Sequence, residues 1–110
     1  MAIRWHPVDA KGIRFSIEED GHEVAHAFLY IMHNDLHAEP FGLLEDVFVS
    51  EDQRSRGYGT RLIKQVIDIA SEFQCYKLIA TSRTSRSDVH RLYTQLGFAS
   101  CGVEFRLDLV

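Results

Sequence analysis

A short segment between a predicted strand and a predicted helix has the composition of an anion site. Its sequence is Arg54-Ser55-Arg56-Gly57-Tyr58-Gly59-Thr60. Glycines lack a Cβ atom, so backbone N–H groups can approach a ligand closely, and a helix start adds unpaired N–H donors and a positive dipole end. The segment therefore suits a phosphate; the alternative is a glycine-rich turn with solvated arginines. It is not a P-loop, because no Gly-Lys-Ser/Thr follows.

Two adjacent carboxylates, Glu45 and Asp46, lie in an otherwise apolar segment. The residues on both sides of the pair, within 41–49, are mostly aliphatic or aromatic, a pattern typical of a strand buried on both faces. Buried carboxylates are costly unless they are paired or used in chemistry. Two interpretations follow: a salt bridge from either acid to Arg83 or Arg106, or a catalytic role for one of them.

The elements that must position these residues alternate between strand and helix patterns. We predict strands at 13–19, 23–33 and 41–49, a helix at 57–73, a strand at 76–81, a helix at 85–96, and one or two closing strands at 98–109. This order, β-β-β-α-β-α-β, predicts an α/β fold (an α+β mixed sheet) in which part of the sheet is antiparallel and part parallel.

Local signals refine these elements. Asp20-Gly21 favours a tight hairpin between the first two strands. Ser85 and Asp88 are spaced as a capping box, and Gly97 suits the position after a helix end. Spacings of three and four predict the buried face of the first helix, which consists of Leu62, Ile63, Val66, Ile67, Ala70 and Phe73.

The composition excludes several classes of protein. The chain has 110 residues, 45% apolar and 25% charged, which predicts one domain over 1–110 and excludes a TIM barrel. The longest apolar run, 27–32, is too short to span a membrane, and the first residues show no signal-peptide pattern. The histidines, Cys75 and Cys101 lack metal-ligand spacing, so we expect no metal and two buried free thiols in a cytoplasmic protein.

Charge is distributed unevenly along the chain. The formal net charge is −4, which argues against a general nucleic-acid binder. No Lys or Arg occurs between Phe15 and Gln53, whereas basic residues dominate from Arg54 onward. The simplest interpretation is that acids and bases pair or are solvated. The alternative is that an anionic ligand contacts the basic half and a cationic ligand the acidic half.

Two longer patterns occur in order along the chain. The first is Leu44-Glu45-Asp46-Val47-Phe48-Val49, then Arg54-x-x-Gly57-x-Gly59 and an amphipathic helix. The second is Leu92-Tyr93-Thr94-Gln95-Leu96-Gly97-Phe98 at the end of the second predicted helix. Together they resemble the signature of the GNAT acetyltransferase superfamily, and the resemblance covers roughly 41–109.

This resemblance implies where acetyl-CoA, the co-substrate, would bind. Its pyrophosphate would lie at the segment 54–60. The strand residues Val47, Phe48 and Val49 would pair their backbone with the pantetheine arm. A bulge there would separate this strand from the one at 76–81, and a backbone N–H near Val47 would hold the acetyl carbonyl.

The resemblance also implies catalytic roles. An amine with an ordinary pKa near ~10 is a cation at neutral pH, and a carboxylate can bind it and take its proton. The pair Glu45-Asp46 is similar to that of glucosamine-6-phosphate and diamine N-acetyltransferases, in which these positions contact the acceptor or its attacking water. We take Glu45 as the base and Asp46 as the alternative. Tyr93 matches the family's frequent general acid, which would protonate the thiolate; a core aromatic is the alternative.

The segment before the first predicted hairpin is shorter than is usual for the family. Family members usually begin with a strand and two helices that cover one side of the acceptor site, whereas only 1–12 precede the hairpin here. We therefore expect an acceptor cleft that is open or closed by a second subunit. A homodimer would also protect the sheet edges.

The predicted function is an N-acetyltransferase that moves the acetyl group of acetyl-CoA to a primary amine of a small molecule or peptide by direct attack in a ternary complex. The alternative is a non-catalytic acyl-CoA-binding or regulatory module of the same fold. An RNA-binding module that uses 54–61, with Tyr58 for stacking, is disfavoured by the acidic first half. We expect neither a nucleic-acid nor a membrane partner.

Overall fold

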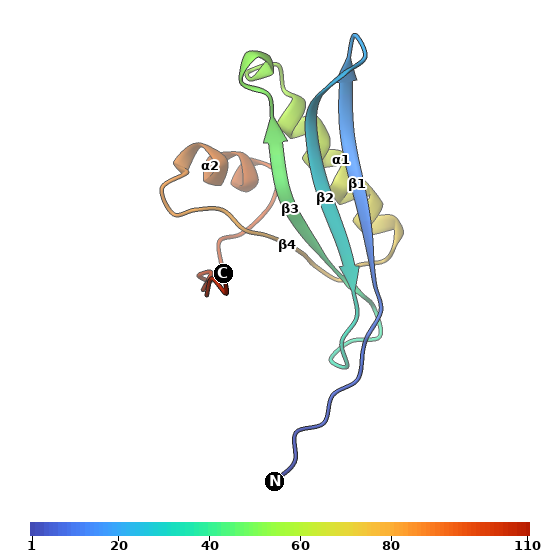
Figure 1. Cartoon of the computed structure of the whole chain (residues 1–110). Coiled ribbons are helices and arrows are strands. Elements are labelled where there is room, and N and C mark those ends of the chain that lie inside the picture. Colours follow the sequence, from blue (N-terminus) through green and yellow to red (C-terminus); the bar gives the residue numbers. More distant parts are fainter. The chain divides into compact units, whose positions relative to one another are not determined.

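Three antiparallel strands and one short parallel strand form a single sheet in the order β1-β2-β3-β4 (Figure 1). The strands are β1 (Ala10–Glu19), β2 (His22–Met32), β3 (Phe41–Val49) and β4 (Leu78–Ala80). β4 pairs with β3 in the parallel direction. The sheet confirms the predicted mixture of antiparallel and parallel pairing.

The structure is a computed structural model that describes residues 1–110 as two compact units, 1–80 and 81–110. The first unit contains the sheet, a short 3-10 helix (Glu51–Gln53) and α1 (Tyr58–Glu72). The second contains α2 (Ser87–Gln95). Residues 1–9 form neither helix nor strand. Neither α-helix combines the length and the apolar composition that a membrane span requires.

A two-residue turn joins β1 to β2, as predicted. Asp20 and Gly21 both have positive φ, at 51° and 79°. Two successive left-handed residues are typical of a type I′ turn, whose twist matches that of the flanking strands. The hairpin then pairs from Glu19 opposite His22 to Ala10 opposite Met32.

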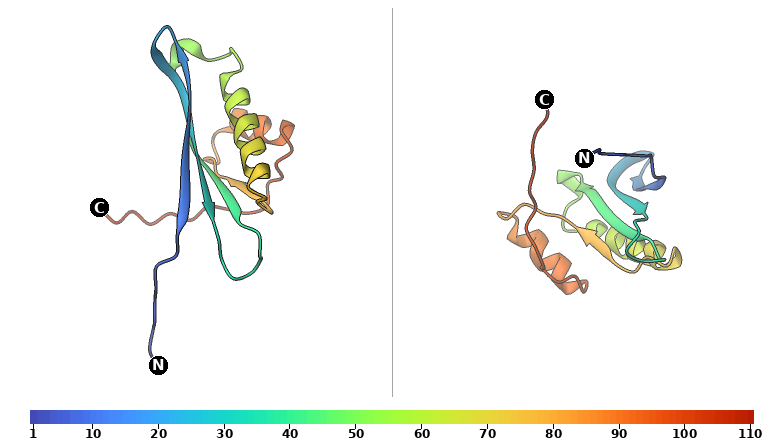
Figure 2. Two further views of the ribbon diagram at one scale, coloured as in Figure 1. Left: turned by 90° about the vertical axis from the view of Figure 1, so that its right-hand side faces the viewer. Right: turned by 90° about the horizontal axis from the view of Figure 1, so that it is seen from below.

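The core lies between the sheet and α1, which packs along one face (Figure 2). The side chains of Leu29, Leu44, Ile63 and Val66 are fully buried there. Phe73, predicted on the buried face of α1, is instead 39% exposed, with Lys11 Nζ 5.0 Å from its ring centroid. The prediction was wrong at this position because the helix ends at Glu72, and Phe73 follows its last turn.

The end of α2 is well defined, but its start differs from the prediction. The helix begins at Ser87, and Asp88 pairs with the side chain of Arg86 rather than completing a capping box with Ser85. At the other end Gly97 has φ 101°, and the N–H of Phe98 donates to the carbonyl of Tyr93. This is a Schellman motif, which confirms the predicted role of Gly97.

The closing strand predicted at 98–109 is absent. Residues 99–110 form no strand and are exposed throughout. The apolar side chains that alternate along this segment are 79–91% exposed, and they are Val103, Phe105, Leu107 and Leu109. The prediction was wrong because alternation shows only that a segment suits a sheet; a strand also needs a neighbour for its backbone hydrogen bonds, and none pairs with this one.

Candidate functional site

A β-bulge interrupts β3 at the acidic pair. Phe28 of β2 lies opposite Glu45, whereas His26 lies opposite Phe48. One residue of β2 between them therefore faces two residues of β3, which is the definition of a bulge. The backbone of Asp46 is left-handed there, with φ 51°. The resemblance implied a bulge in this strand, and the structure has it at Asp46.

The bulge brings both acids to one face of the sheet. In a regular strand, neighbouring side chains point to opposite faces. Glu45 lies opposite Phe28, and the carboxylate of Asp46 reaches the ring of His26, two residues before Phe28 on β2. Within residues 1–80, α1 covers only one face of the sheet. We call the other face, on which these side chains lie, the open face. An extra residue in β3 thus places two adjacent carboxylates side by side.

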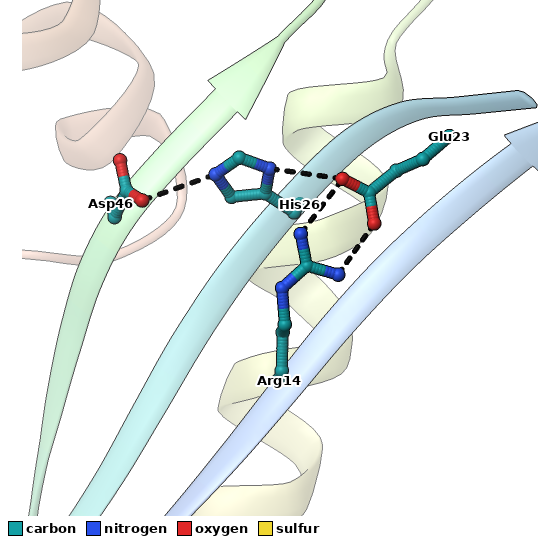
Figure 3. Close-up of polar contacts among 4 residues, drawn as sticks. All are labelled: Arg14, Glu23, His26 and Asp46. Atoms are coloured by element: carbon teal, nitrogen blue, oxygen red, sulfur yellow. Dashed lines mark hydrogen bonds and ion pairs between the residues drawn. The ribbon is translucent and has the colours of Figure 1, made fainter.

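The acids are less buried than the apolar pattern predicted. The Asp46 side chain is 65% exposed and Glu45 is half-buried; within β3 only Gly42 and Leu44 are buried. The prediction of burial on both faces was wrong because no element of residues 1–80 packs on the open face. Within residues 1–80, Asp46 pairs with His26 (Figure 3).

The second half of β3 has a strand partner on one side only. β4 pairs with Gly42, Leu43 and Leu44 and ends opposite Leu44. From Glu45 to Val49 the strand pairs with β2 alone. The backbone edge of this half is therefore open to pair with an extended ligand that carries amide groups, which is the role the resemblance implies for Val47, Phe48 and Val49.

The loop before α1 has the geometry of an anion site. Ser55 and Gly57 have φ of 71° and 78°, and the first helical hydrogen bond runs from the N–H of Arg61 to the carbonyl of Gly57 at 3.0 Å. The N–H groups of 58–60 are thus the unpaired donors of the first turn, which contains no acid. Gly59 is not required by packing, because an added Cβ would meet only Val49 Cγ2, at 3.7 Å. These features fit a phosphate group.

Two side chains of this loop are held by the protein itself. Arg54 Nε donates to the carbonyl of Val49 at 3.1 Å, which ties the loop to the end of β3. Tyr58 is buried, and its hydroxyl donates to Glu19. That hydrogen bond, together with burial, raises the pKa of Tyr58. The ring is therefore unavailable to stack on a base, which removes the main support for the RNA-binding alternative.

A histidine that the sequence did not single out lies beside the acids. His26 lies on β2, an interior strand, and its side chain is only 19% exposed. Its Nε2 lies 3.1 Å from Asp46 Oδ2, and its ring stacks on Phe48 with centroids 5.3 Å apart. The sequence did contain one indication of this placement. Side chains two residues apart in a strand lie on the same face, and His26 lies two residues before Phe28.

Aromatic rings line the open face next to the acids. Phe28 and Tyr30 stack with centroids 6.1 Å apart, and Arg14 lies 5.6 Å from the Phe28 centroid. Phe48 is 45% exposed. Carboxylates beside aromatic faces form a surface suited to an organic cation.

Tyr93, the predicted acid, lies in the second unit. It is on α2, half-buried, and its ring packs against Phe98 with centroids 5.2 Å apart. This contact accompanies the Schellman motif and fixes the ring against the end of its helix. The two cysteines are free; Cys75 is half-buried, which raises the pKa of its thiol, and Cys101 is exposed rather than buried as expected.

A bulged strand with a partner on one side only, followed by a glycine-rich helix start, lies in this mixed α/β fold. The chain matches the acetyltransferase (GNAT) family over residues 2–98 and belongs to that family. This confirms the resemblance drawn from the two sequence patterns. Acetyltransferases of this family use acetyl-CoA as co-substrate.

Curated proteins and a solved structure support this membership. The chain is 34% identical over 77 residues to an aminoglycoside N(6′)-acetyltransferase type 1 of Serratia marcescens, covering 70% of this chain and 51% of that protein. It is 33% identical over 66 residues to a probable glucosamine 6-phosphate N-acetyltransferase 2 of Oryza sativa subsp. japonica, covering 60% and 38%. A putative acetyltransferase of Agrobacterium tumefaciens superposes with a TM-score of 0.82 at 31% identity, covering 88% and 68%. The chain thus spans about half or less of these two curated relatives.

Proposed function

We propose that this chain is an N-acetyltransferase that moves the acetyl group of acetyl-CoA to a primary amine by direct attack in a ternary complex. The observation that carries the proposal is the bulge at Asp46, which sets two carboxylates beside the unpaired half of β3. A base for the amine and a binding edge for the donor thus adjoin on one strand. The proposal takes residues 1–110 as one acetyltransferase domain.

Acetyl-CoA would be held by two adjoining features. The N–H groups of residues 57–60, with Arg54 and Arg56 beside them, would bind the pyrophosphate. The open edge of Val47–Val49 would pair with the pantetheine arm, which is an extended chain with two amides. A backbone N–H near Val47 would donate to the acetyl carbonyl and stabilise the negative charge that develops there.

The reaction needs one proton removed and one delivered. A carboxylate of the acidic pair binds the ammonium and takes its proton; Glu45 is the first choice for this base and Asp46 the alternative. The neutral nitrogen attacks the acetyl carbon, a C–N bond forms and the C–S bond breaks. Tyr93 donates the proton that the thiolate requires, and it recovers a proton from the nitrogen by way of solvent.

A cationic amine is the acceptor class that the site favours. Glu45 and Asp46 share the open face with Phe28 and Tyr30, so charge and aromatic surface both suit an ammonium group. The two curated relatives have names that specify N-acetylation of an aminoglycoside and of glucosamine 6-phosphate. We further propose a cytoplasmic homodimer in which a second copy covers an exposed sheet edge such as that of β1.

Release of the CoA thiol in the presence of an amine panel tests the proposal. The panel contains diamines, an aminoglycoside, glucosamine 6-phosphate and lysine peptides. We expect turnover with at least one amine, and a drop in kcat/KM of about 10²-fold or more for Glu45→Gln or for Asp46→Asn, because each removes one candidate base. Glu72→Gln, an exposed acid at the end of α1, is the matched control and should retain wild-type turnover.

The alternatives give different results in the same assay. A rise in melting temperature with acetyl-CoA but no thiol release with any amine would favour a non-catalytic binding module. If neither CoA nor acetyl-CoA raises the melting temperature at saturating concentration, the enzyme and the binding module are both excluded.

A further inference from the structure

Two side-chain hydrogen bonds connect the loop 54–60 to the sheet. At the start of the loop, Arg54 Nε donates to the carbonyl of Val49, the last residue of β3, at 3.1 Å. Near its end, the hydroxyl of Tyr58 donates to Oε1 of Glu19, the last residue of β1. The tip of the β1–β2 hairpin and the start of α1 lie at the same end of the sheet (Figure 1, Figure 2). One loop is thus fixed to two different strands.

Tyr58 is held by its ring as well as by its hydroxyl. It is the first residue of α1 and is only 7% exposed. A phenylalanine ring would fill the same space, so the hydroxyl is needed only for its polar contacts. Because Glu19 is exposed and lies beside the hairpin turn, its contact with Tyr58 adds little to the core. Its main effect is on where the first turn of α1 is held.

The backbone between the two hydrogen bonds needs to be held in place. Ser55 and Gly57 both have positive φ, at 71° and 78°, and this conformation is disfavoured for a residue other than glycine. The N–H groups of 58–60 follow directly and have no acceptor within the helix. The N–H of Tyr58 is the first of them, so fixing its side chain also fixes these donors. Donors that are fixed before binding lose less entropy when a ligand binds.

Charge at this end of the sheet also affects an anionic ligand. The hairpin contributes Glu18, Glu19 and Asp20, and acids repel a phosphate. The hydrogen bond with Glu19 raises the pKa of Tyr58, and the guanidinium of Arg56, which interacts with the same hydroxyl, acts in the opposite direction. The hydroxyl thus lies between an acid of the hairpin and a base of the loop.

We propose that Tyr58 is a positioning residue for the donor, because its hydroxyl, bonded to Glu19, holds the first turn of α1 so that the N–H groups of 58–60 are preorganised for the pyrophosphate of acetyl-CoA. This inference rests on the donor site of the proposed function and deepens it, since it adds a residue of β1 to those that determine donor affinity. Neither side chain needs to touch acetyl-CoA. The expected effect is therefore on the affinity for donors that carry phosphates, and not on the acyl transfer step.

The first arm of the test compares Tyr58→Phe with Tyr76→Phe by isothermal titration calorimetry with acetyl-CoA. Tyr58→Phe keeps the ring and removes only the hydroxyl. Tyr76, a half-buried tyrosine whose ring stacks on His37, is the matched control. We expect the dissociation constant to rise about three- to tenfold in Tyr58→Phe, as for one lost hydrogen bond, and to stay at the wild-type value in Tyr76→Phe. A wild-type dissociation constant in Tyr58→Phe would overturn the inference.

The second arm uses S-acetylpantetheine, a donor without phosphates, together with an amine that the wild type acetylates. With acetyl-CoA, we expect Tyr58→Phe to raise KM about three- to tenfold and to leave kcat unchanged. With S-acetylpantetheine, kcat/KM should equal that of the wild type. Equal losses with both donors would show a general structural defect and would overturn the inference.

The third arm measures 15N relaxation of the backbone amides without any ligand. We expect lower order parameters for 58–60 in Tyr58→Phe than in the wild type, and no change for 42–44. Unchanged order parameters at 58–60 would overturn the inference.

The two hypotheses fail differently. Acetylation with wild-type affinity for acetyl-CoA in Tyr58→Phe removes the role of Tyr58 alone. If no amine is acetylated, the proposed function is removed, and the first and third arms still decide the role of Tyr58 in donor binding. If the wild type does not bind acetyl-CoA, both are removed.

Discussion

The first half of β3, Phe41–Leu44, is paired with β2 on one side, and its residues Gly42–Leu44 are also paired with β4 on the other, whereas the second half, Glu45–Val49, is paired with β2 only. The first half contains the fully buried Leu44. The second contains both acids, the bulge and the exposed ring of Phe48. The bulge at Asp46 lies at the boundary between the two.

This contrast shows how one strand can serve both the core and a site. Pairing on both sides leaves no backbone group for a ligand, and burial leaves no room for charge. Once β4 ends, the backbone edge of β3 is open, and carboxylates can be solvated. The bulge then turns two adjacent side chains to the same face.

The largest expected effect is a loss of protein stability from a substitution in the first half of β3. Leu44→Ala should lower the free energy of unfolding by about 2–5 kcal/mol, because it leaves a cavity between the sheet and α1. Phe48→Ala in the second half should cost less than about 1 kcal/mol, since the ring is 45% exposed. Urea denaturation measures both. Equal losses in the two variants would contradict the contrast.

The next effect concerns the bulge itself. Asp46→Val should lower the free energy of unfolding by about 1–3 kcal/mol, because a β-branched residue is strained at φ 51°. Asp46→Gly should stay within about 1 kcal/mol of wild type, since glycine adopts this conformation without strain. Thermal melts of the two variants give the comparison. A valine variant as stable as the glycine variant would mean that the bulge is absent in solution.

The smallest effect is a pH dependence from the ion pair between Arg14 and Glu23 on the open face. The pKa of Glu23 lies at about 2, below its ordinary range, because Arg14 donates to it. A lowered pKa in the folded state stabilises the protein above the ordinary value near 4.5, and this contribution is lost as the pH falls toward 2.

Glu23→Gln should therefore melt below wild type at pH 6, and the difference should vanish near pH 2. Arg14→Gln should remove the same pH-dependent part, because it removes the same ion pair. A difference between wild type and Glu23→Gln that stays constant from pH 6 to pH 2 would show that the pair does not form.

Local patterns were enough to predict most of the fold. The Asp20-Gly21 turn, the range 41–49 and a helix close to Tyr58–Glu72 all follow from residue types and spacing over a few residues. The closing strand at 98–109 could not be predicted correctly, because its alternation of apolar and polar residues says nothing about whether a neighbouring strand is present.

The site was predicted less fully, for a related reason. The acids and the anion loop carry local signals, so Glu45, Asp46 and 54–60 could be named from the sequence. The face that the acids share depends on the register between β2 and β3, and the contact of His26 with Asp46 joins residues on different strands. Such register-dependent neighbours leave no trace in local spacing.

Backbone amide NMR during an acetyl-CoA titration tests the central claim most directly, namely that the second half of β3 and the start of α1 form the donor site. We predict that the amides of Val47–Val49 and of 57–60 shift on binding, while those of 42–44 stay nearly unchanged. Binding without shifts at Val47–Val49, or with shifts confined to the first half of β3, would contradict the account.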